Sequence, residues 1–309
     1  MRNWNFDSKL ILDSFGGVSL GVSHVMINDT KSLGSPIDNA LMFATKKKFN
    51  MDCIDALRTI TDACIIIESE LIEYFKDISL KNHIIVVENP RLYFAKALKL
   101  IIESSNRNRK YIMKDNNIII GENVCIGRNC TLEPSIFIDN NVVIGDDVIK
   151  KTGAKIRENV IIGNNVVVGE NTVIGGQGFG IEKDSDGRNI RIPHIGGVII
   201  GNNVEIGALA SIASGTMEPT IIEDNCFIDD LNHIGHNCKI GTGTMTTACA
   251  QFGGSSSIGA NGYIAPNSTI RNGIKLGDNC FVGQATSVQK SFGDNVSLVG
   301  SPAREFERK

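Results

Sequence analysis

Histidine is the side chain whose proton equilibrium lies closest to neutral pH, so the five histidines of this 309-residue chain are the first candidates for acid–base chemistry. Two of them, His233 and His236, lie on either side of Ile234, and Asp229 comes seven residues before His236. A carboxylate beside an imidazole can fix its tautomer and stabilise its charged form. His236 and Asp229 therefore suit a general base and its orienting acid, and an incidental surface histidine with a solvated aspartate is the alternative.

A repeat of six residues positions these side chains. Apolar residues, nearly all aliphatic, recur at every sixth position from Ile120 to Ile174 and again from Ile222 to Val288, often with a glycine directly behind, and Lys150 and Thr246 are exceptions. Neither the helical period nor the strand period leaves a mark at every sixth residue over such a length. Each hexad predicts a short strand with its aliphatic residue inside, and three hexads form a triangular coil that stacks on the next at about 4.8 Å.

The phase of the repeat places the candidate base. Ile234 should point into the coil, so His236, two residues later and near a corner, should face outward. Gly254 comes one full coil after His236 and should stack beside it; a simple turn glycine is the alternative. The repeat is interrupted at 176–196 and 213–220, and such insertions must leave the coil as loops, which often carry function.

The first part of the chain lacks the hexad. Residues 64–67 and 84–87 are apolar runs typical of strands, and Asn89 followed by Pro90 is a typical helix start. We therefore expect a small α/β domain over 1–112, a repeat domain over 113–292 and a short tail over 293–309.

Composition excludes several classes of protein. There are 31 basic and 34 acidic residues, a balance that argues against a nucleic-acid partner. The chain has no run of 18 apolar residues, which argues against integral membrane association, and its start does not resemble a secretory signal. Its eight cysteines form no CxxC pair, which suits a reducing cytoplasm. We found no phosphate-binding glycine loop and no metal-ligand spacing.

The hexads resemble the left-handed parallel β-helix of hexapeptide acyltransferases. Three segments, at 175–180 (GGQGFG), 192–208 (IPHIGGVIIGNNVEIGA) and 220–241 (TIIEDNCFIDDLNHIGHNCKIG), are similar to the bacterial UDP-3-O-acylglucosamine N-acyltransferases of lipid A synthesis. The segments 42–49 (MFATKKKF) and 86–98 (VVENPRLYFAKAL) resemble that family's uridine-binding domain. The resemblance implies a mostly β fold, in which a left-handed parallel β-helix of hexapeptide repeats is preceded by a small α/β domain.

The resemblance also implies catalytic roles. Acyl transfer from a thioester to an amine needs a base, an oxyanion stabiliser and close alignment of the reactants. His236 lies where the family has its catalytic base, Asp229 matches a family aspartate, and Gly254 matches the glycine that offers the oxyanion donor.

Substrate contacts follow from the same resemblance. His233 and His194 would contact substrate, with a structural or exposed role for His233 as the alternative, and Gly178 and Phe179 would form part of a loop over the sugar. In the α/β domain Phe43 and Phe49 would sandwich a uracil ring, with core packing as the alternative. Lys46, the first residue of the lysine run 46–48, would meet a diphosphate, with a solvated surface position as the alternative.

The chain departs from the family pattern at several positions. Residues 213–215 read Ala-Ser-Gly where the family has Asp-Arg-Gly, and Gly273 replaces an expected second histidine. Lys46 replaces an asparagine, Phe49 a tyrosine and His194 a glutamine. The sequence also ends soon after the last coil, without the family's helical extension, in a Gly-Ser-Pro-Ala segment similar to the ends of coenzyme A-dependent sugar acetyltransferases.

These features together predict an N-acyltransferase that acts on a nucleotide-linked amino sugar. It would hold no permanent cofactor, take its acyl group from an acyl carrier protein or coenzyme A thioester, and form a homotrimer with sites at subunit contacts. The alternatives are an acetyl-CoA-dependent sugar acetyltransferase for surface glycans, a non-catalytic β-helix scaffold and a β-helix of the carbonic anhydrase type. The last needs three histidines, and none lies one coil from His233 and His236. The sugar, the acyl length and the carrier stay open.

Overall fold

The computed structural model describes residues 4–47, 49–105 and 110–306. The chain forms two compact units. The α/β unit comprises Met1–Arg107 and Phe179–Pro193, and the β-helix unit comprises Asn108–Gly178 and His194–Lys309. The second interval of the α/β unit is therefore an excursion out of the β-helix.

The α/β unit is built on a five-stranded sheet in the order β2-β7-β6-β5-β4. β4 to β7 are parallel and β2 is antiparallel at the edge. Every residue of the two central strands is buried, as their unbroken apolar runs predict. The strand bounds are β2 (Val18–Gly21), β4 (Asp29–Thr30), β5 (Ala40–Ala44), β6 (Cys64–Ile67) and β7 (His83–Val86), beside a small β1 (Phe6–Asp7) and β3 (Met26–Ile27) pair.

The main helix of this unit, α4 (Pro90–Ser104), begins where the sequence predicts. Asn89 Oδ1 accepts a hydrogen bond from the Leu92 N–H at 3.0 Å, and Pro90 needs no N–H partner in the first turn. Phe94, among others, is buried. The other helical segments are α1 (Ser8–Phe15), α2 (Asp52–Thr59), α3 (Ile72–Phe75), η1 (Ser69–Leu71) and η2 (Ile78–Leu80), with η3 (Asp115–Asn117) in the β-helix unit.

The excursion from the β-helix folds as the antiparallel hairpin of β19 (Ile181–Lys183) and β20 (Asn189–Arg191). Its Glu182 pairs with Arg91 of α4 at 2.6 Å. The hairpin thus belongs with the α/β unit, although it interrupts the repeat.

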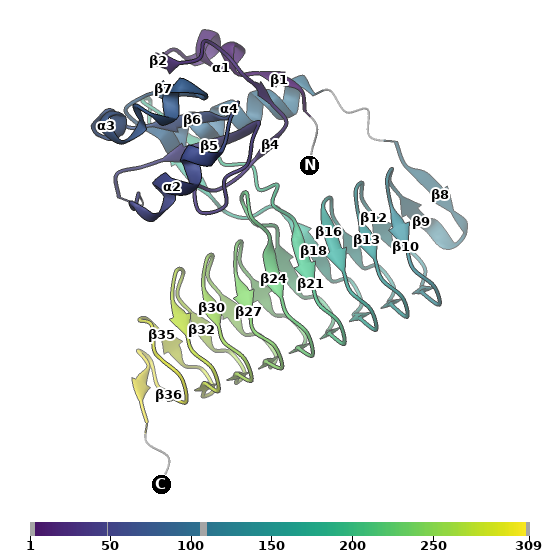
Figure 1. Ribbon diagram of the computed structural model, residues 1–309. Helices are drawn as coiled ribbons and strands as arrows, with labels where there is room; N and C mark the ends of the chain where they lie inside the picture. The colour runs from purple at the N-terminus through teal and green to yellow at the C-terminus, as the bar shows by residue number, and fades with distance from the viewer. Residues whose placement is uncertain (1–3, 48, 106–109, 307–309) are drawn as a thin grey trace. The chain divides into compact units, whose positions relative to one another are not determined.

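The β-helix unit has three walls, which we call sheets I, II and III after the order of β10, β11 and β12, the strands of the first complete coil (Figure 1). Sheet I contains β10 (Cys125–Ile126), β13 (Val143–Ile144), β16 (Val160–Ile162), β21 (Val198–Ile200), β24 (Thr220–Ile222), β27 (Lys239–Ile240), β30 (Ser257–Ile258) and β33 (Lys275–Leu276). Sheet II contains β11 (Thr131–Leu132), β14 (Ile149–Lys150), β17 (Val167–Val168), β22 (Glu205–Ile206), β25 (Phe227–Ile228), β28 (Met245–Thr246), β31 (Tyr263–Ile264), β34 (Phe281–Val282), β36 (Ser297–Val299) and β37 (Arg304–Glu305). Sheet III contains β8 (Ile112–Lys114), β9 (Ile118–Ile120), β12 (Phe137–Ile138), β15 (Lys155–Ile156), β18 (Val173–Gly176), β23 (Ser211–Ala213), β26 (His233–Ile234), β29 (Gln251–Phe252), β32 (Thr269–Ile270) and β35 (Ser287–Val288).

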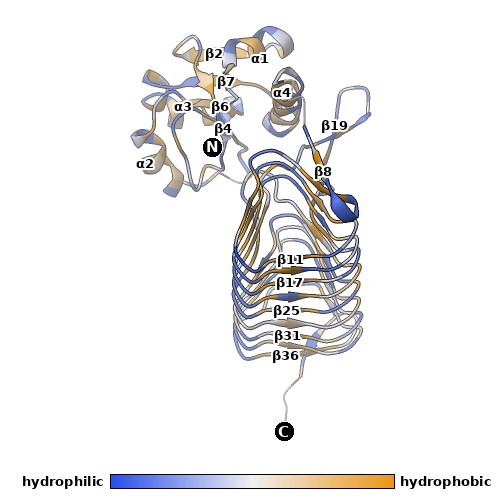
Figure 2. Ribbon diagram, turned by 90° about the vertical axis from the view of Figure 1, so that its right-hand side faces the viewer, coloured by the Kyte–Doolittle hydropathy of each residue, from blue (hydrophilic) through white to orange (hydrophobic). Residues whose placement is uncertain are grey.

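Strands of one wall stack in parallel except at the ends, where β8 pairs antiparallel with β9 and β37 with β36. Figure 2 shows β11, β17, β25, β31 and β36 of sheet II one above another. In sheet I the insertions do not disturb this stacking, because Ile162 pairs with Ile200 and Ile200 with Ile222 across both interruptions. In sheet III the register between β18 and β23 shifts between Ile174 and Gly176, where the first insertion begins. This architecture confirms the predicted fold class, a mostly β protein with a parallel β-helix of hexapeptide repeats preceded by a small α/β domain.

The interior explains why small polar residues and cysteines recur two positions before the aliphatic residues. Cys226 Sγ and Cys238 Sγ donate to carbonyl oxygens at 3.2 Å in the next coil, and the Thr244 hydroxyl does the same at 2.9 Å. Burial raises the pKa of the Cys226 thiol to about 11, so it stays protonated. These cysteines are hydrogen-bonded core residues.

Lys150 takes an aliphatic position inside the coil. The side chain is fully buried, and within the described part of the chain its Nζ has no hydrogen-bond partner. Burial lowers the pKa of the Lys150 amine to about 8. The repeat therefore tolerates a buried amine that weakens the fold.

Two edges of the prism matter for function. Edge III–I is the line of turns from a sheet III strand to the next sheet I strand, and both insertions leave from it, after β18 and after β23. Edge II–III is the line of turns from sheet II to sheet III, which continues as regular hexads past β25 and β26.

Candidate active site

His236 lies on edge III–I, directly after β26. Ile234 of that strand is fully buried, while His236 is partly exposed. The imidazole therefore projects from the corner, as the hexad phase predicts. Both insertions leave from this same edge, so the departures from the repeat gather around this side chain.

Asn237 fixes the tautomer of His236. His236 Nδ1 lies 3.1 Å from Asn237 Oδ1. Asn237 Nδ2 donates to the Glu218 carbonyl oxygen at 2.8 Å, while Oδ1 accepts from the Thr216 N–H at 3.0 Å and the Thr216 hydroxyl at 2.9 Å. Because Oδ1 acts as an acceptor, Nδ1 must carry the proton. The lone pair then lies on Nε2, the nitrogen that a general base would use.

Gly254 faces that nitrogen from the next coil. A methyl group added at Gly254 would overlap His236 Nε2 and lie 2.7 Å from Cε1. The Ser255 N–H donates to the His236 carbonyl oxygen at 2.7 Å, which fixes the two turns against each other. The predicted stacking of Gly254 beside His236 is therefore present, and a side chain at this position would displace the imidazole.

His194 and Gly178 lie on the other side of His236. The His194 ring is 2% exposed, and its centroid lies 4.8 Å from that of His236 at an interplanar angle of 60°. A methyl group added at Gly178 would lie 2.5 Å from His194 Cδ2 and 2.8 Å from His236 Cβ. The structure thus places both predicted substrate contacts, His194 and Gly178, beside the candidate base, but the His194 side chain is buried.

The predicted pairing of Asp229 with His236 is wrong within one chain. Asp229 lies at the turn before β26 and His236 at the turn after it, so the two residues stand at opposite ends of one strand. Asn237, the next residue in the chain, supplies the Nδ1 partner instead. Because an extended strand separates Asp229 from His236, the two side chains belong to different edges of the prism.

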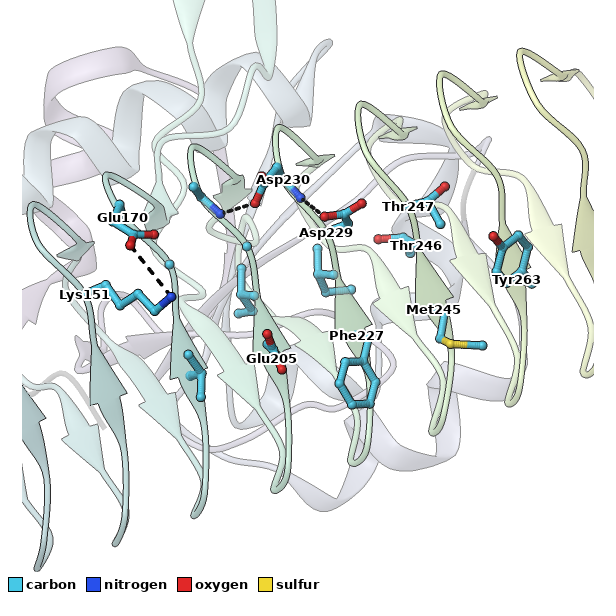
Figure 3. Close-up of a pocket in the computed structure, with 16 residues that line it drawn as sticks. Lys151, Glu170, Glu205, Phe227, Asp229, Asp230, Met245, Thr246, Thr247 and Tyr263 are labelled. Carbon is cyan, nitrogen blue, oxygen red and sulfur yellow. Dashed lines mark hydrogen bonds and ion pairs between the residues drawn. The ribbon is translucent and has the colours of Figure 1, made fainter.

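Asp229 instead lines a groove on sheet II beside edge II–III (Figure 3). The cavity measures about 380 Å³. Asp229 Oδ1 accepts from the Asp230 N–H at 2.8 Å, and Asp230 Oδ1 accepts from the Ala208 N–H at 2.7 Å. Glu170, paired with Lys151 at 3.7 Å, lies along the same turns. The groove therefore has an acidic border.

His233 projects from β26 and is exposed. The surrounding protein atoms, and next the charge of nearby His236, lower the pKa of His233. An imidazole with a lowered pKa is neutral at pH 7, and among the described residues no hydrogen-bond partner orients the His233 ring as Asn237 orients that of His236. It lies near the candidate base, on the face of sheet III.

The α/β unit holds the other predicted residues. The Phe43 ring lies 4.8 Å from that of Phe94, and the Phe49 ring lies 5.4 Å from that of Tyr74. Each ring thus packs on a neighbour within the α/β unit and stays partly exposed, and the sandwich of a uracil ring by Phe43 and Phe49 stays a prediction. The N–H of Lys46 donates to Glu68 Oε2 at 2.9 Å, and Lys48 of the same basic run lies outside the described residues.

Phe179 lies in the α/β unit, at the start of the excursion. Its side chain is 78% exposed, with the Arg191 guanidinium 5.5 Å from the ring centroid. Phe179 is thus an open aromatic surface, in contrast to the buried His194 at the other end of the same insertion.

Sequence patterns did not single out Asn237, Thr216 or Gln177. Asn237 directly follows His236 in the sequence, but its contact with the neighbouring imidazole depends on the corner geometry. In the described ranges no group of three or more histidine, cysteine, aspartate or glutamate side chains is arranged to hold a metal ion. The helices of that same part of the chain are too short or too polar to cross a bilayer.

Family models match the repeat. The model of the bacterial transferase hexapeptide, which describes six repeats, matches residues 141–176 and 219–254, and the model of the hexapeptide repeat of succinyl-transferase matches 256–285. The matched segments include β26 and the turn that carries His236.

Whole-chain relatives are more specific. The chain is 35% identical over 272 residues to the UDP-3-O-acylglucosamine N-acyltransferase of Methylobacillus flagellatus, covering 82% of this chain and 74% of that protein. It is 40% identical over 228 residues to the protein of the same name from Helicobacter hepaticus, covering 72% and 70%. The UDP-N-acetylglucosamine acyltransferase structure from Francisella novicida superposes with a TM-score of 0.56 at 24% identity, over 61% of this chain and 67% of that one, and shares the fold.

Proposed function

This chain belongs to the UDP-3-O-acylglucosamine N-acyltransferase family, and from that premise we propose that it transfers an acyl group from a thioester to the amine of a UDP-linked amino sugar. The observation that carries the proposal is the imidazole of His236. Its Nδ1 is held by Asn237 and its Nε2 faces Gly254. A neutral imidazole with a fixed tautomer and an open edge is the arrangement that a general base requires.

In the proposed reaction Nε2 accepts a proton from the sugar amine while the amine nitrogen attacks the thioester carbonyl carbon. The tetrahedral intermediate then breaks its C–S bond, and the imidazolium passes the proton to the departing sulfur. The products are an amide and a free thiol. During this sequence Asn237 Oδ1 accepts the Nδ1 hydrogen bond and stabilises the transient imidazolium.

The backbone of Gly254 is our candidate for the oxyanion donor. Its lack of a side chain lets a substrate carbonyl approach the same edge of the imidazole at which the proton is transferred. A backbone N–H aimed at the developing oxyanion is an established way to stabilise such an intermediate.

We further propose a homotrimer. One β-helix unit carries the base on edge III–I and the acidic groove on sheet II, so no single copy brings His236 and Asp229 together. A closed ring in which edge III–I of one copy faces the sheet II groove of the next would give every copy both halves. Phe227 and Met245, which are 50% and 44% exposed in the groove, supply apolar surface for that contact. The carboxylates of the groove would attract a cationic amine.

We assign the nucleotide to the α/β unit, with Phe43, Phe49 and Lys46 as candidate contacts. We assign the sugar to His233 and Gly178 beside the base, and we keep the exposed ring of Phe179 as a further candidate sugar contact. The support is the similarity of residues 42–49 and 86–98 to the uridine-binding domain of the family. We expect an acyl carrier protein or coenzyme A to deliver the acyl group in the cytoplasm, where the eight free cysteines stay reduced.

A thiol-release assay tests this proposal. Acetyl-CoA, longer acyl-CoAs and acyl carrier protein thioesters are offered against UDP- and dTDP-linked amino sugars, with the matching hydroxyl sugars as controls. We expect thiol release only with an amine acceptor and preferentially with UDP. Release that needs no acceptor amine, or none with any pair while the purified trimer is intact, would contradict it.

A further inference from the structure

The inserted segment enters and leaves the β-helix unit at the candidate base. The chain departs after Gly178 and returns at His194, and the fifteen residues between them, Phe179–Pro193, belong to the α/β unit. Both end points lie against His236. The insertion therefore does more than interrupt the repeat, because its two ends build one wall of the space around the imidazole.

This wall is rigid. The Gln177 side chain bonds both backbone groups of His194: Nε2 donates to the His194 carbonyl oxygen and Oε1 accepts from the His194 N–H, each at 2.9 Å. The Gln177 amide thus fixes the backbone of the returning segment at His194 with the same pair of hydrogen bonds that a paired strand would make. With its backbone fixed and its ring 2% exposed, His194 has little freedom to change rotamer.

The wall also has no spare room. A Cβ at Gly178 would come within 2.7 Å of His194 Nε2 and 2.8 Å of His236 Cβ, so the two histidines are packed against the bare backbone of Gly178. On the opposite side the backbone of Gly254 lies beside Nε2, and only the lack of a side chain there leaves the Nε2 edge open. The His236 ring is thereby confined between two glycine backbones and a second imidazole.

Confinement matters because the Nδ1 hydrogen bond alone does not fix the ring. One hydrogen bond at 3.1 Å leaves the ring free to tilt about that contact, and a displacement of the reacting atom by about 1 Å can cost roughly 100-fold in rate. The ring of His194, 4.8 Å away and tilted by 60°, blocks this motion on the side of the insertion.

We propose that His194 is a positioning residue, whose buried ring sets the orientation of the His236 imidazole so that Nε2 points along the edge of Gly254. This assignment rests on the proposed function of His236 as the base. It replaces the expectation that His194 contacts substrate, because a ring that is 2% exposed presents almost no surface to a ligand.

Three substitutions separate the ring from its nitrogens. His194→Phe keeps a planar ring and loses both nitrogens, His194→Gln keeps a polar side chain and loses the ring, and His194→Ala loses both. We expect kcat to fall about 10-fold to 100-fold in the alanine and glutamine variants, with KM for both substrates nearly unchanged, and to recover to within a few-fold in the phenylalanine variant. Lys183→Ala, on the exposed β19 strand of the same insertion, is the matched control and should keep the wild-type kcat.

A double-mutant cycle tells positioning from general loss of structure. In a His236→Ala background, His194→Ala should lower the residual rate less than two-fold, because there is no imidazole left to orient. Equal losses in both backgrounds would overturn the proposal, as would a wild-type kcat in His194→Ala. Thermal unfolding of each variant shows which rates come from folded protein.

An activity-independent readout keeps this inference separate from the proposed function. The ¹⁵N signals of the His236 imidazole, assigned by their loss in His236→Ala, should show one tautomer in the wild type and in His194→Phe, and averaging or a shift toward the other tautomer in His194→Ala and His194→Gln. Unchanged signals in all folded variants would overturn the role of His194. If the signals change but His236→Ala retains full activity, the positioning holds and the assignment of His236 as the base fails.

Discussion

Edges III–I and II–III of the β-helix are made by the same hexads, yet they differ in how far they depart from the repeat. Edge II–III runs through regular turns, and its functional feature is a row of carboxylates such as Asp229 beside an open groove. Edge III–I carries both insertions, and there His236 is enclosed by Gly178, His194 and Gly254. The comparison teaches that the repeat supplies a stable frame, while the interruptions create a confined imidazole that no regular coil would provide.

The largest expected effect lies on edge III–I. His236→Ala should lower kcat by roughly 10²–10⁴-fold with little change in KM, because the base acts in the transition state. Thiol release measured under saturating substrates checks this. His233→Ala removes a proposed sugar contact on the same strand and not the base, so its kcat should stay within a few-fold of wild type. If His233→Ala collapses while His236→Ala remains active, the two histidines exchange roles.

A second prediction tests the tight packing on that edge. Gly254→Ala places a methyl group against His236 Nε2, so we expect kcat to fall about 10²–10³-fold through displacement of the imidazole and loss of the oxyanion contact. Gly293→Ala is the control, because a methyl group there has no atom within 4 Å. Wild-type kcat in a folded Gly254→Ala protein would show that this edge has more room than the structure describes.

The sequence predicted those features of the two edges that follow from the six-residue period, and it did not predict those that depend on contacts between distant segments. The period of six maps directly onto coils, so the outward placement of His236 and the stacking of Gly254 followed from counting. The error at Asp229 arose because seven residues span a whole strand, which carries the two side chains to opposite edges. The burial of His194 and the contacts of Phe43 depend on packing between segments distant in sequence, which local spacing does not encode.

The buried amine of Lys150, in the interior of the β-helix behind both edges, gives a third prediction, which concerns the pH dependence of stability. Below pH 8 the Lys150 amine carries a proton in the folded and unfolded states, and its burial cost is constant. Between pH 8 and 10.5 only the unfolded chain holds the proton, so raising the pH should stabilise the fold by up to ~3 kcal/mol, from a pKa lowered from 10.5 to about 8. Lys150→Met should abolish this rise and be more stable at pH 7, as chemical denaturation across pH would show.

Lys151→Met is the matched control, since Lys151 directly follows Lys150 in the chain but its side chain points outward and pairs with Glu170. The rise in the free energy of unfolding should persist in that variant. A Lys150→Met protein that keeps the same pH dependence would place the titrating group elsewhere.

The smallest expected effect lies on edge II–III. Asp229→Asn should raise KM for the amino sugar about 10-fold and change kcat less than His236→Ala does, because a carboxylate that binds the amine acts on the ground state as well. Steady-state kinetics against both substrates test this, with Glu205→Gln in the same groove as the control. If Asp229→Asn lowered kcat as much as His236→Ala does, the residues of both edges would contribute equally to catalysis, which would contradict this prediction.

The most direct test of the central claim is the tautomer of His236 in the resting protein. The ¹⁵N chemical shifts of the assigned imidazole, recorded at a pH where the ring is neutral, report which nitrogen holds the proton. The structure predicts a protonated Nδ1, hydrogen-bonded to Asn237, and an unprotonated Nε2 facing Gly254. A protonated Nε2 with a free Nδ1 would contradict the account, because the nitrogen that faces the proposed substrate would then have no lone pair with which to accept the proton of the amine.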